Sequence, residues 1–201
     1  MSGQIGAVVL AGGRSSRFGG EKLVEPIDGR QMLDHAIEAV RTVAVDIVVV
    51  LAPDADLPVP LGIRIVHDAR SFEGPLVGLA TGLAALEPAT DQVLVVAGDM
   101  PDLVPAVLAH LVQALALAPQ AAVALGQAGR PQPLPMAVVR ASAETTASLL
   151  IEAGERSLRA LVTALEAVII PEPMWRADDP DAATLRDIDT RADLAERKST
   201  D

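Results

Sequence analysis

The sequence predicts an α/β fold of the Rossmann-like kind, with three layers and a mostly parallel sheet. Short aliphatic segments, rich in valine and isoleucine, alternate along the chain with longer segments whose apolar residues recur at helical spacing. The short segments are apolar throughout, which is typical of strands covered on both faces. Several of them end in glycine or aspartate, at the place where open α/β sheets bind their ligands.

The expected strands and helices run through the whole chain. The strands are predicted at residues 5–10, 46–51, 63–67, 92–97, 121–125, 134–139 and 167–171. The helices are predicted at residues 31–41, 75–86, 104–118, 141–153, 157–165 and 190–197. Residues 172–184 are polar, contain two prolines and are predicted to form a loop. Because no linker divides the chain, we expect one domain over residues 1–197 and a frayed tail over residues 198–201.

Composition limits the classes of partner. The 201 residues carry a formal net charge of −11, and the basic residues form no stripe, which argues against nucleic acid and anionic membrane surfaces as partners. No apolar run approaches the roughly 20 residues of a membrane span. The chain contains no cysteine, which excludes disulfides and thiolate metal sites. We therefore expect small-molecule substrates, no membrane association and a cytoplasmic location.

The segment LAGGRSSRFGGEK, residues 10–22, follows the first predicted strand and combines two glycine pairs with Arg14, Arg17 and Lys22. It is not a P-loop, because the lysine does not follow a glycine and no hydroxyl residue follows the lysine. It is not a dinucleotide fingerprint either, because its glycines come as adjacent pairs. Backbone N–H groups in such a loop bind anions, and the three cations add to this. The alternative is a plain turn whose basic residues face water.

Two aspartates follow predicted strands at the same edge of the sheet. Asp68 comes directly after residues 63–67, and Asp99 comes two residues after residues 92–97. Mg²⁺ prefers oxygen ligands and is held by one or two carboxylates together with substrate phosphates. The sequence therefore predicts a site for Mg²⁺ and phosphate at this edge. The alternative for each aspartate is a structural one, the capping of the turn that follows its strand.

The same loop resembles a family signature. LAGGRSSRFGGEK is similar to the L-A-G-G-x-S-x-R-M-G-x-x-K motif of nucleotidyltransferases that activate sugars and cofactors, and most similar to its MobA-like branch, the molybdenum cofactor guanylyltransferases. Further similar segments follow in the family's order: HDARSFEGPLVGLATGL (67–83), VLVVAGDMPDL (93–103), GRPQPLPMAVVR (129–140), LLIEAGERSLRALV (149–162) and RDIDTRADLAER (186–197). The resemblance covers nearly the whole chain. Two residues depart from it, since Phe18 replaces a methionine and Arg191 replaces a proline.

The resemblance implies a single-domain nucleotidyltransferase fold and a role for each matching residue. The implied nucleotide-binding residues are Leu10, Ala11, Gly12, Gly13, Arg14, Lys22, Asp68 and Asp99. The implied catalytic residues are Arg17, Lys22 and Asp99, and the implied metal ligands are Asp99 and Asp187. Asp189 is an alternative to Asp187 as a ligand, although a helix start with Thr190 and Asp193 is the preferred interpretation of Asp189.

The implied activity is the Mg²⁺-dependent transfer of a nucleoside monophosphate, GMP from GTP, to the terminal phosphate of molybdopterin, with release of pyrophosphate. This chemistry depends mainly on positioning and charge neutralisation and needs no general base if the acceptor phosphate is ionised. His35, His67 and His110 are accordingly predicted to be structural. The branch reads guanine with an asparagine, but Ala52 and Pro53 stand at that place here, and Asp54 or Asp56 could replace it only with a shift.

Other functions remain open beside this one. A related nucleotidyltransferase would use CTP, or a sugar phosphate or another cofactor as acceptor. A non-catalytic module would only bind nucleotide, although Lys22 and Asp99 together favour an enzyme. Arg156 and Arg159 are expected on the acceptor side, and a molybdoenzyme chaperone is the protein partner that the resemblance allows for.

Overall fold

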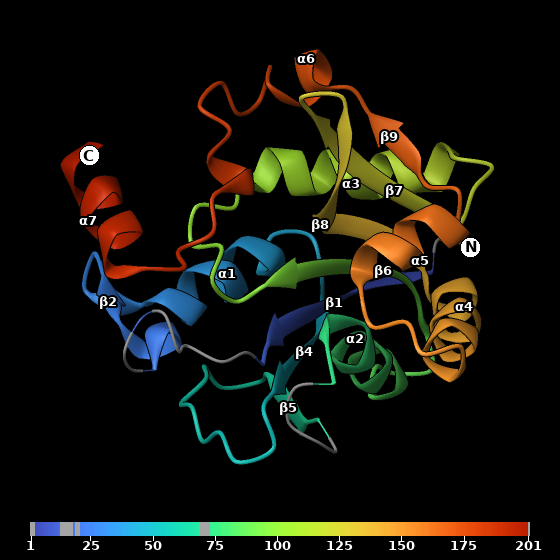
Figure 1. Cartoon of the computed structure of the whole chain (residues 1–201), viewed down its shortest axis with the longest axis horizontal. Helices are drawn as coiled ribbons and strands as arrows, with labels where there is room; N and C mark the ends of the chain where they lie inside the picture. Colours follow the sequence, from blue (N-terminus) through green and yellow to red (C-terminus); the bar gives the residue numbers. More distant parts are fainter. Residues whose placement is uncertain (1–2, 13–17, 19–20, 69–72, 201) are drawn as a thin grey trace.

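The computed structural model of the chain describes residues 3–12, 18, 21–68 and 73–200. Its main sheet consists of β1 (Gln4–Ala11), β4 (Asp46–Leu51), β5 (Arg64–His67), β6 (Thr90–Ala97), β7 (Ala122–Gln127), β8 (Arg130–Val139) and β9 (Val168–Ile170). The spatial order is β5-β4-β1-β6-β8-β7-β9, and helices lie on both sides of the sheet (Figure 1). The prediction of a three-layer α/β fold is confirmed.

All pairs in the sheet are parallel except those of β8, which runs antiparallel to β6 and to β7. The reversal comes from a two-residue turn between β7 and β8, in which Ala128 has φ 49° and Gly129 has φ 73°. Positive φ at both positions is what a tight hairpin requires. β8 also begins earlier than predicted, at Arg130 instead of residue 134. The prediction began too late because Pro131 and Pro133 are atypical of strands.

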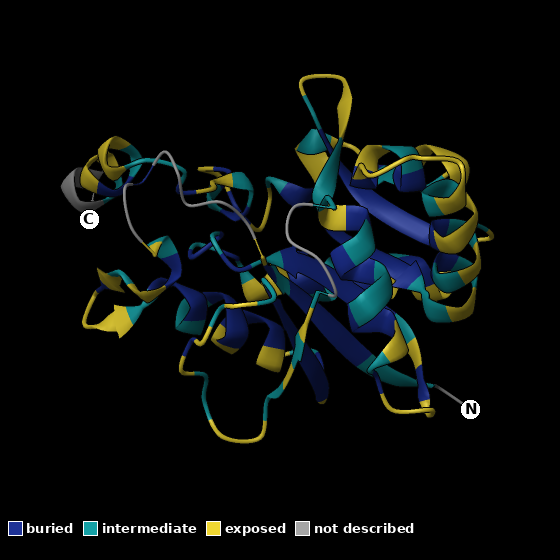
Figure 2. Ribbon diagram, turned by 60° about the horizontal axis from the view of Figure 1, so that its bottom comes forward, coloured by how far each residue is buried: buried dark blue, intermediate teal, exposed yellow. Residues whose placement is uncertain are grey.

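The helices form two layers. They are α1 (Met32–Arg41), α2 (Pro75–Ala84), α3 (Pro105–Leu117), α4 (Arg140–Glu152), α5 (Leu158–Ala164), α6 (Glu172–Trp175) and α7 (Arg191–Thr200). α1 and α3 cover one face of the sheet, and α2, α4 and α5 cover the other. Adjacent residues of β1 show the result, because Val8 and Val9 are both fully buried in opposite apolar layers. Figure 2 shows the central strands buried along their length.

Three parts of the chain differ from the sequence prediction. A 3-10 turn, η2 (Lys22–Val24), and a small hairpin of β2 (Pro26–Ile27) and β3 (Arg30–Gln31) precede α1. The predicted loop over residues 172–184 instead contains α6, because Trp175 is fully buried there and its Nε1 donates to Gly126 O at 2.9 Å. α7 continues to Thr200, beyond the predicted end at residue 197. None of the helices in the described ranges has the length and hydropathy needed to span a bilayer.

Candidate active site

The carboxyl ends of β1, β4, β5 and β6 bring the predicted site residues to one edge of the sheet. The amide of Gly98, after β6, donates to Leu10 O of β1 at 2.9 Å. The amide of Asp68, after β5, donates to Leu51 O of β4 at 3.0 Å. Gly12, Asp68 and Asp99 therefore lie along the same edge, as parallel strands require. Gly13, Arg14 and Arg17 lie outside the described residues.

Lys22 lies at the centre of a charge cluster at this edge. Its Nζ donates to Asp99 Oδ2 at 2.6 Å, to Asp189 Oδ1 at 2.9 Å and to the carbonyl oxygen of Ile188 at 3.2 Å. The amide of Ile188 in turn donates to Asp99 O at 3.0 Å. We call these four residues the Lys22 cluster. In the sequence, Asp99 lies 77 residues and Asp189 lies 167 residues from Lys22. The Asp99 carboxylate points to Lys22 instead of capping its own turn.

The electrostatics of the cluster favour added positive charge. Burial lowers the pKa of Lys22, but the carboxylates of Asp99 and Asp189 outweigh this, so its pKa is raised and the side chain is an ammonium. Burial raises the pKa of the nearby Asp187, and the charges of Asp189 and Asp99 raise it further. Within the part of the chain that the structure describes, one ammonium thus lies near three carboxyl groups, which leaves an excess of negative charge there.

The donor atoms of this region suit Mg²⁺. Carboxylate oxygens of Asp99, Asp187 and Asp189 and a backbone carbonyl are hard ligands of the kind that Mg²⁺ takes. Among the described residues, no three acidic or histidine side chains are arranged as a metal-binding group. The Lys22 ammonium instead lies within 3 Å of both Asp99 and Asp189. The residues therefore fit the ion chemically, and Lys22 holds the position between two of the carboxylates.

The helix start that the sequence predicted at Asp189, Thr190 and Asp193 is present: the amide of Asp189 donates to Asp193 Oδ2 at 3.0 Å, while the Asp189 carboxylate accepts from Lys22 Nζ. Thr190 and Asp193 cap the helix reciprocally: the Thr190 amide donates to Asp193 Oδ2 at 2.7 Å, and the Asp193 amide donates to Thr190 Oγ1 at 3.2 Å. The Thr190 hydrogen bonds lower the pKa of Asp193. With the helix start satisfied in this way, the Asp189 carboxylate is available to Lys22.

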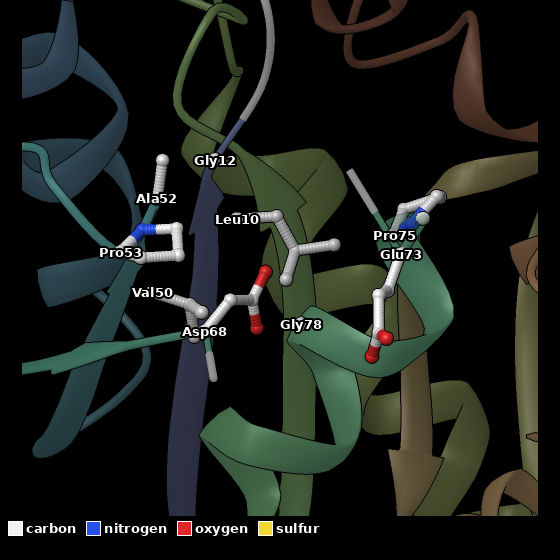
Figure 3. Close-up of a pocket in the computed structure, with 10 residues that line it drawn as sticks. Leu10, Gly12, Val50, Ala52, Pro53, Asp68, Glu73, Pro75 and Gly78 are labelled. Atoms are coloured by element: carbon white, nitrogen blue, oxygen red, sulfur yellow. The ribbon is translucent and has the colours of Figure 1, made fainter. Parts of the chain in front are cut away.

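A hollow of about 230 Å³ opens beside the glycine-rich segment (Figure 3). Its walls are Leu10, Gly12, Val50, Ala52, Pro53, Asp68, Glu73, Gly74, Pro75 and Gly78, and we call it the nucleotide pocket. The Asp68 carboxylate points between Leu10 and Gly78. A Cβ at Gly78 would lie 3.3 Å from Asp68 Oδ2, and one at Gly12 would lie 3.7 Å from the same atom. Glycine at both positions therefore leaves room around this carboxylate.

Asp68 is the polar centre of the pocket wall. Burial raises its pKa, the Thr81 hydroxyl opposes this, and the charge of Glu73 raises it further. The Thr81 hydroxyl itself donates to Val77 O at 3.2 Å. Asp68 Oδ1 is buried and has no hydrogen-bond partner of normal geometry among the described residues. The carboxylate thus presents an acceptor atom toward the pocket. The alternative role as a turn cap concerns residues 69–72, which lie outside the described residues.

The loop after β4 carries the residues that stand where the family has an asparagine. Ala52 and Pro53 line the pocket, whereas Asp54 and Asp56 are exposed and do not contribute to its described walls. His67 Nε2 lies 3.0 Å from Ala55 O across this loop, which agrees with its predicted structural role. Among the residues that the structure describes, the acidic side chains lining the pocket are therefore Asp68 and Glu73. The sequence analysis missed Glu73, although it lies in the quoted 67–83 segment.

The two departures from the family signature contact each other. The Arg191 guanidinium lies 5.1 Å from the centre of the Phe18 ring, which is buried, and Arg191 Nε donates to Phe18 O at 3.3 Å. Arg191 Nη2 also pairs with Glu25 at 3.3 Å. The start of α7 is therefore attached both to Phe18 and, through Asp189, to Lys22.

Comparisons with known proteins identify the family of this chain. The family model of the MobA-like NTP transferase domain matches residues 7–168. A probable molybdenum cofactor guanylyltransferase of Chloroflexus aggregans is 37% identical over 194 residues, which cover 93% of this chain and 90% of that protein.

Two solved structures share the fold. Molybdopterin-guanine dinucleotide biosynthesis protein A of Archaeoglobus fulgidus has a TM-score of 0.79 at 21% identity, with 97% of each chain covered. The 4-diphosphocytidyl-2C-methyl-D-erythritol synthase of Anaerococcus prevotii has a TM-score of 0.73 at 15% identity, with 98% of each chain covered. The matched family model and the identity over most of the chain show that this protein belongs to the MobA-like NTP transferase family and is a nucleotidyltransferase.

Proposed function

We propose that the protein transfers GMP from GTP to the terminal phosphate of molybdopterin, with Mg²⁺ as cofactor, and releases pyrophosphate. The observation that carries this proposal is the Lys22 cluster, in which an ammonium and carboxylates from three distant segments meet beside the nucleotide pocket. A protein that only binds nucleotide has no need of Asp99 and Asp189 against Lys22, because their negative charge disfavours a triphosphate.

In this proposal the chain acts by positioning and by charge neutralisation. The pocket residues Leu10 and Gly12 hold the base, which places the triphosphate along the glycine-rich segment. Lys22 neutralises charge on the α-phosphate and on the leaving pyrophosphate. Asp99, together with Asp187 or Asp189, would hold Mg²⁺, which would supply Lewis acidity at this place when bound. The acceptor phosphate attacks as an anion, so that no general base is required.

The choice of guanine rests on the polar groups of the pocket. Guanine presents two neighbouring donors, N1–H and the N2 amine, whereas cytosine presents one amine beside acceptor atoms. The polar side chains in the described walls, Asp68 and Glu73, are both acceptors when ionised. A carboxylate that accepts two hydrogen bonds can take the place of the family's asparagine. The hollow of about 230 Å³ is smaller than the usual site for a whole drug-sized ligand and suits a base.

The choice of molybdopterin rests on relatives. The C. aggregans relative, 37% identical over most of both chains, is named a probable molybdenum cofactor guanylyltransferase, and so is one from Mycobacterium avium at 34% identity. The fold alone does not select the substrate, since the cytidylyl enzyme of A. prevotii has it too. The proposal includes a cytoplasmic location, with which a chain lacking cysteine is compatible. It also includes Arg14 and Arg17 as further contacts to the triphosphate.

Nucleotide-dependent thermal stability tests the nucleotide part of the proposal. The protein is unfolded with GTP, CTP, ATP or UTP, each with and without Mg²⁺. A ligand present at 100 times its dissociation constant stabilises the folded state by about 2.7 kcal/mol, which is readily measured. We expect the largest shift with GTP and Mg²⁺ together. A larger shift with CTP would assign the protein to cytidylyl transfer, and no shift with any nucleotide would contradict the proposal.

A further inference from the structure

A second hollow, of about 200 Å³, lies between β8 and α5. Its described walls are Arg130, Pro131 and Pro133 from β8 and Arg159, Val162 and Thr163 from α5. We call it the Arg130–Arg159 hollow. It belongs neither to the nucleotide pocket nor to the Lys22 cluster.

The hollow lies at the substrate edge of the sheet. The pairing of β6 with β8 extends to Val95 opposite Met136, so the first residues of β8 project beyond the end of β6, where Asp99 follows. On the other wall, the chain just before α5 contacts the start of α2, because the amide of Leu76 donates to Arg156 O at 3.1 Å. The start of α2 is itself part of the nucleotide pocket. The hollow is therefore a neighbour of the pocket, on the β8 side of the edge.

The two arginines of the hollow have no partner for their charge among the described residues. Of the described lysine and arginine side chains, the guanidinium groups of Arg30, Arg130 and Arg159 are those without a hydrogen bond or ion pair to the described part of the chain. Arg30 belongs to the small β2–β3 hairpin, and the other two line one hollow. Arg156, by contrast, donates to Ile151 O at 2.9 Å and to Glu155 O at 2.7 Å.

Both arginines are exposed, and within the described ranges they lack an acidic partner in a chain with 27 acidic and 16 basic residues. The hollow beside α7 shows the ordinary arrangement. There Arg197 pairs with Asp102 at 2.8 Å, and Arg186 lies 3.7 Å from the same aspartate. The Arg130–Arg159 hollow has no acidic residue in its described walls. A negative group placed there would gain charge-assisted hydrogen bonds from the guanidinium groups.

We propose that the Arg130–Arg159 hollow binds a second anionic group of the acceptor substrate, an oxyanion or thiolate apart from the phosphate that attacks the nucleotide. The identity of the acceptor rests on the function proposed above, while the anion site rests on the two arginines. Guanidinium groups bind such anions through paired N–H donors. Pro131, Pro133 and Val162 add an apolar wall against which a flat ring of the acceptor packs.

Steady-state kinetics with molybdopterin and GTP test this assignment. We compare Arg130→Gln, Arg159→Gln and the double variant with Arg30→Gln, the control that removes an equally unpaired arginine elsewhere. We expect the KM for the acceptor to rise about tenfold in each single variant and about a hundredfold in the double variant. The KM for GTP and kcat should stay within about twofold, because neither arginine lines the nucleotide pocket. An unchanged acceptor KM in the double variant would overturn the assignment.

A second measurement separates this assignment from the proposed function. Binding of inorganic phosphate is measured by calorimetry with the nucleotide pocket filled by GMP. We expect the double variant to lose a binding event that the wild type and Arg30→Gln retain; equal binding in all three would overturn the anion site. If the wild type transfers nothing to molybdopterin but the double variant still loses phosphate binding, the proposed acceptor is wrong and the anion site stands.

Discussion

The Lys22 cluster and the nucleotide pocket lie at one edge of the sheet but hold their charges differently. In the cluster, Lys22 is already paired with Asp99 and Asp189, at 2.6 and 2.9 Å. In the pocket, Asp68 is a buried carboxylate whose Oδ1 lacks a partner among the described residues. A ligand of the cluster must therefore replace an existing ion pair, whereas a ligand of the pocket supplies donors that are missing. On this contrast rests our proposal that the cluster exchanges Lys22 for a metal cation and that the pocket recognises the base.

The largest effect is expected for Asp99→Asn, which removes one charge at nearly constant volume. Turnover should fall about a thousandfold or more, because the variant loses the carboxylate proposed to hold the Mg²⁺ that neutralises the reacting phosphates. The midpoint of thermal unfolding should change by less than about 4 °C, since Lys22 keeps Asp189. The matched control is Asp91→Asn, at the opposite end of β6 and exposed, which should retain full activity. Activity of Asp99→Asn within tenfold of wild type would remove Asp99 from the mechanism.

Lys22→Met tests the exchange of cations directly. Turnover should fall by about two to three orders of magnitude, because the charge opposite the triphosphate is gone. Binding of Mg²⁺ without nucleotide should instead become about tenfold tighter, because the ammonium no longer competes for Asp99 and Asp189. Isothermal titration with MgCl₂ measures this. Weaker Mg²⁺ binding in the variant would show that Lys22 and the ion do not compete for these carboxylates.

Asp68→Asn tests base recognition in the pocket. The amide replaces one acceptor by a donor, so the affinity for GTP should fall about 10- to 100-fold, a loss of about 1–3 kcal/mol. Asp54→Asn, on the exposed loop after β4, is the control and should bind GTP normally. Equilibrium binding of GTP and CTP checks both the size and the selectivity of the loss. Unchanged GTP binding would leave Glu73 or a backbone group as the reader of the base.

The same variant has a pH-dependent signature. The folded-state pKa of Asp68 is raised mainly by burial, so the folded protein binds this proton more tightly than the unfolded chain does. Stability from this group therefore falls as pH rises from the unfolded pKa of about 3.9 through the higher folded pKa. Without ligand, Asp68→Asn should match the wild type near pH 3 and be the more stable protein at pH 7. Urea unfolding at the two pH values measures the difference, and the opposite order would contradict it.

The smallest effect concerns the support of the cluster by α7. Arg191 is largely exposed, and a cation–π contact at an exposed site contributes about 0.5–1 kcal/mol. A double-mutant cycle of Arg191→Ala and Phe18→Met should therefore give a coupling of that size in the free energy of unfolding. Arg30→Ala combined with Phe18→Met is the control pair and should be additive. Additivity in the test pair would mean that the two departures meet without stabilising each other.

The regular elements were predictable because their signals are local. Residues 46–51 form β4 with the predicted bounds. All six residues are buried, and the five that follow Asp46 are aliphatic. The proline at the start of α2 marked that helix correctly. β8 was predicted only in part, because its reversal depends on a turn with φ of 49° and 73° that propensity alone does not indicate.

Strand ends indicated part of the candidate site, and Lys22 was predicted from the family motif. Gly12, Asp68 and Asp99 could be placed because a strand end fixes their edge. Asp189 was expected at the start of α7, where its amide does bond to Asp193, but the contact of its carboxylate with Lys22, 167 residues away, has no local signal in the sequence. The residues next to Asp189 do not indicate whether its carboxylate caps α7 or pairs with a distant cation. Here the Asp193 carboxylate caps the helix, and the Asp189 carboxylate pairs with Lys22.

The rate of pyrophosphate release by the wild-type protein, with molybdopterin as acceptor and with GTP or CTP in the presence and absence of Mg²⁺, tests the central claim most directly. We expect release that requires molybdopterin and Mg²⁺ together and that is faster with GTP than with CTP. Release with CTP but not with GTP, or no release under any of these conditions, would contradict the assignment of the Lys22 cluster and the nucleotide pocket to guanylyl transfer.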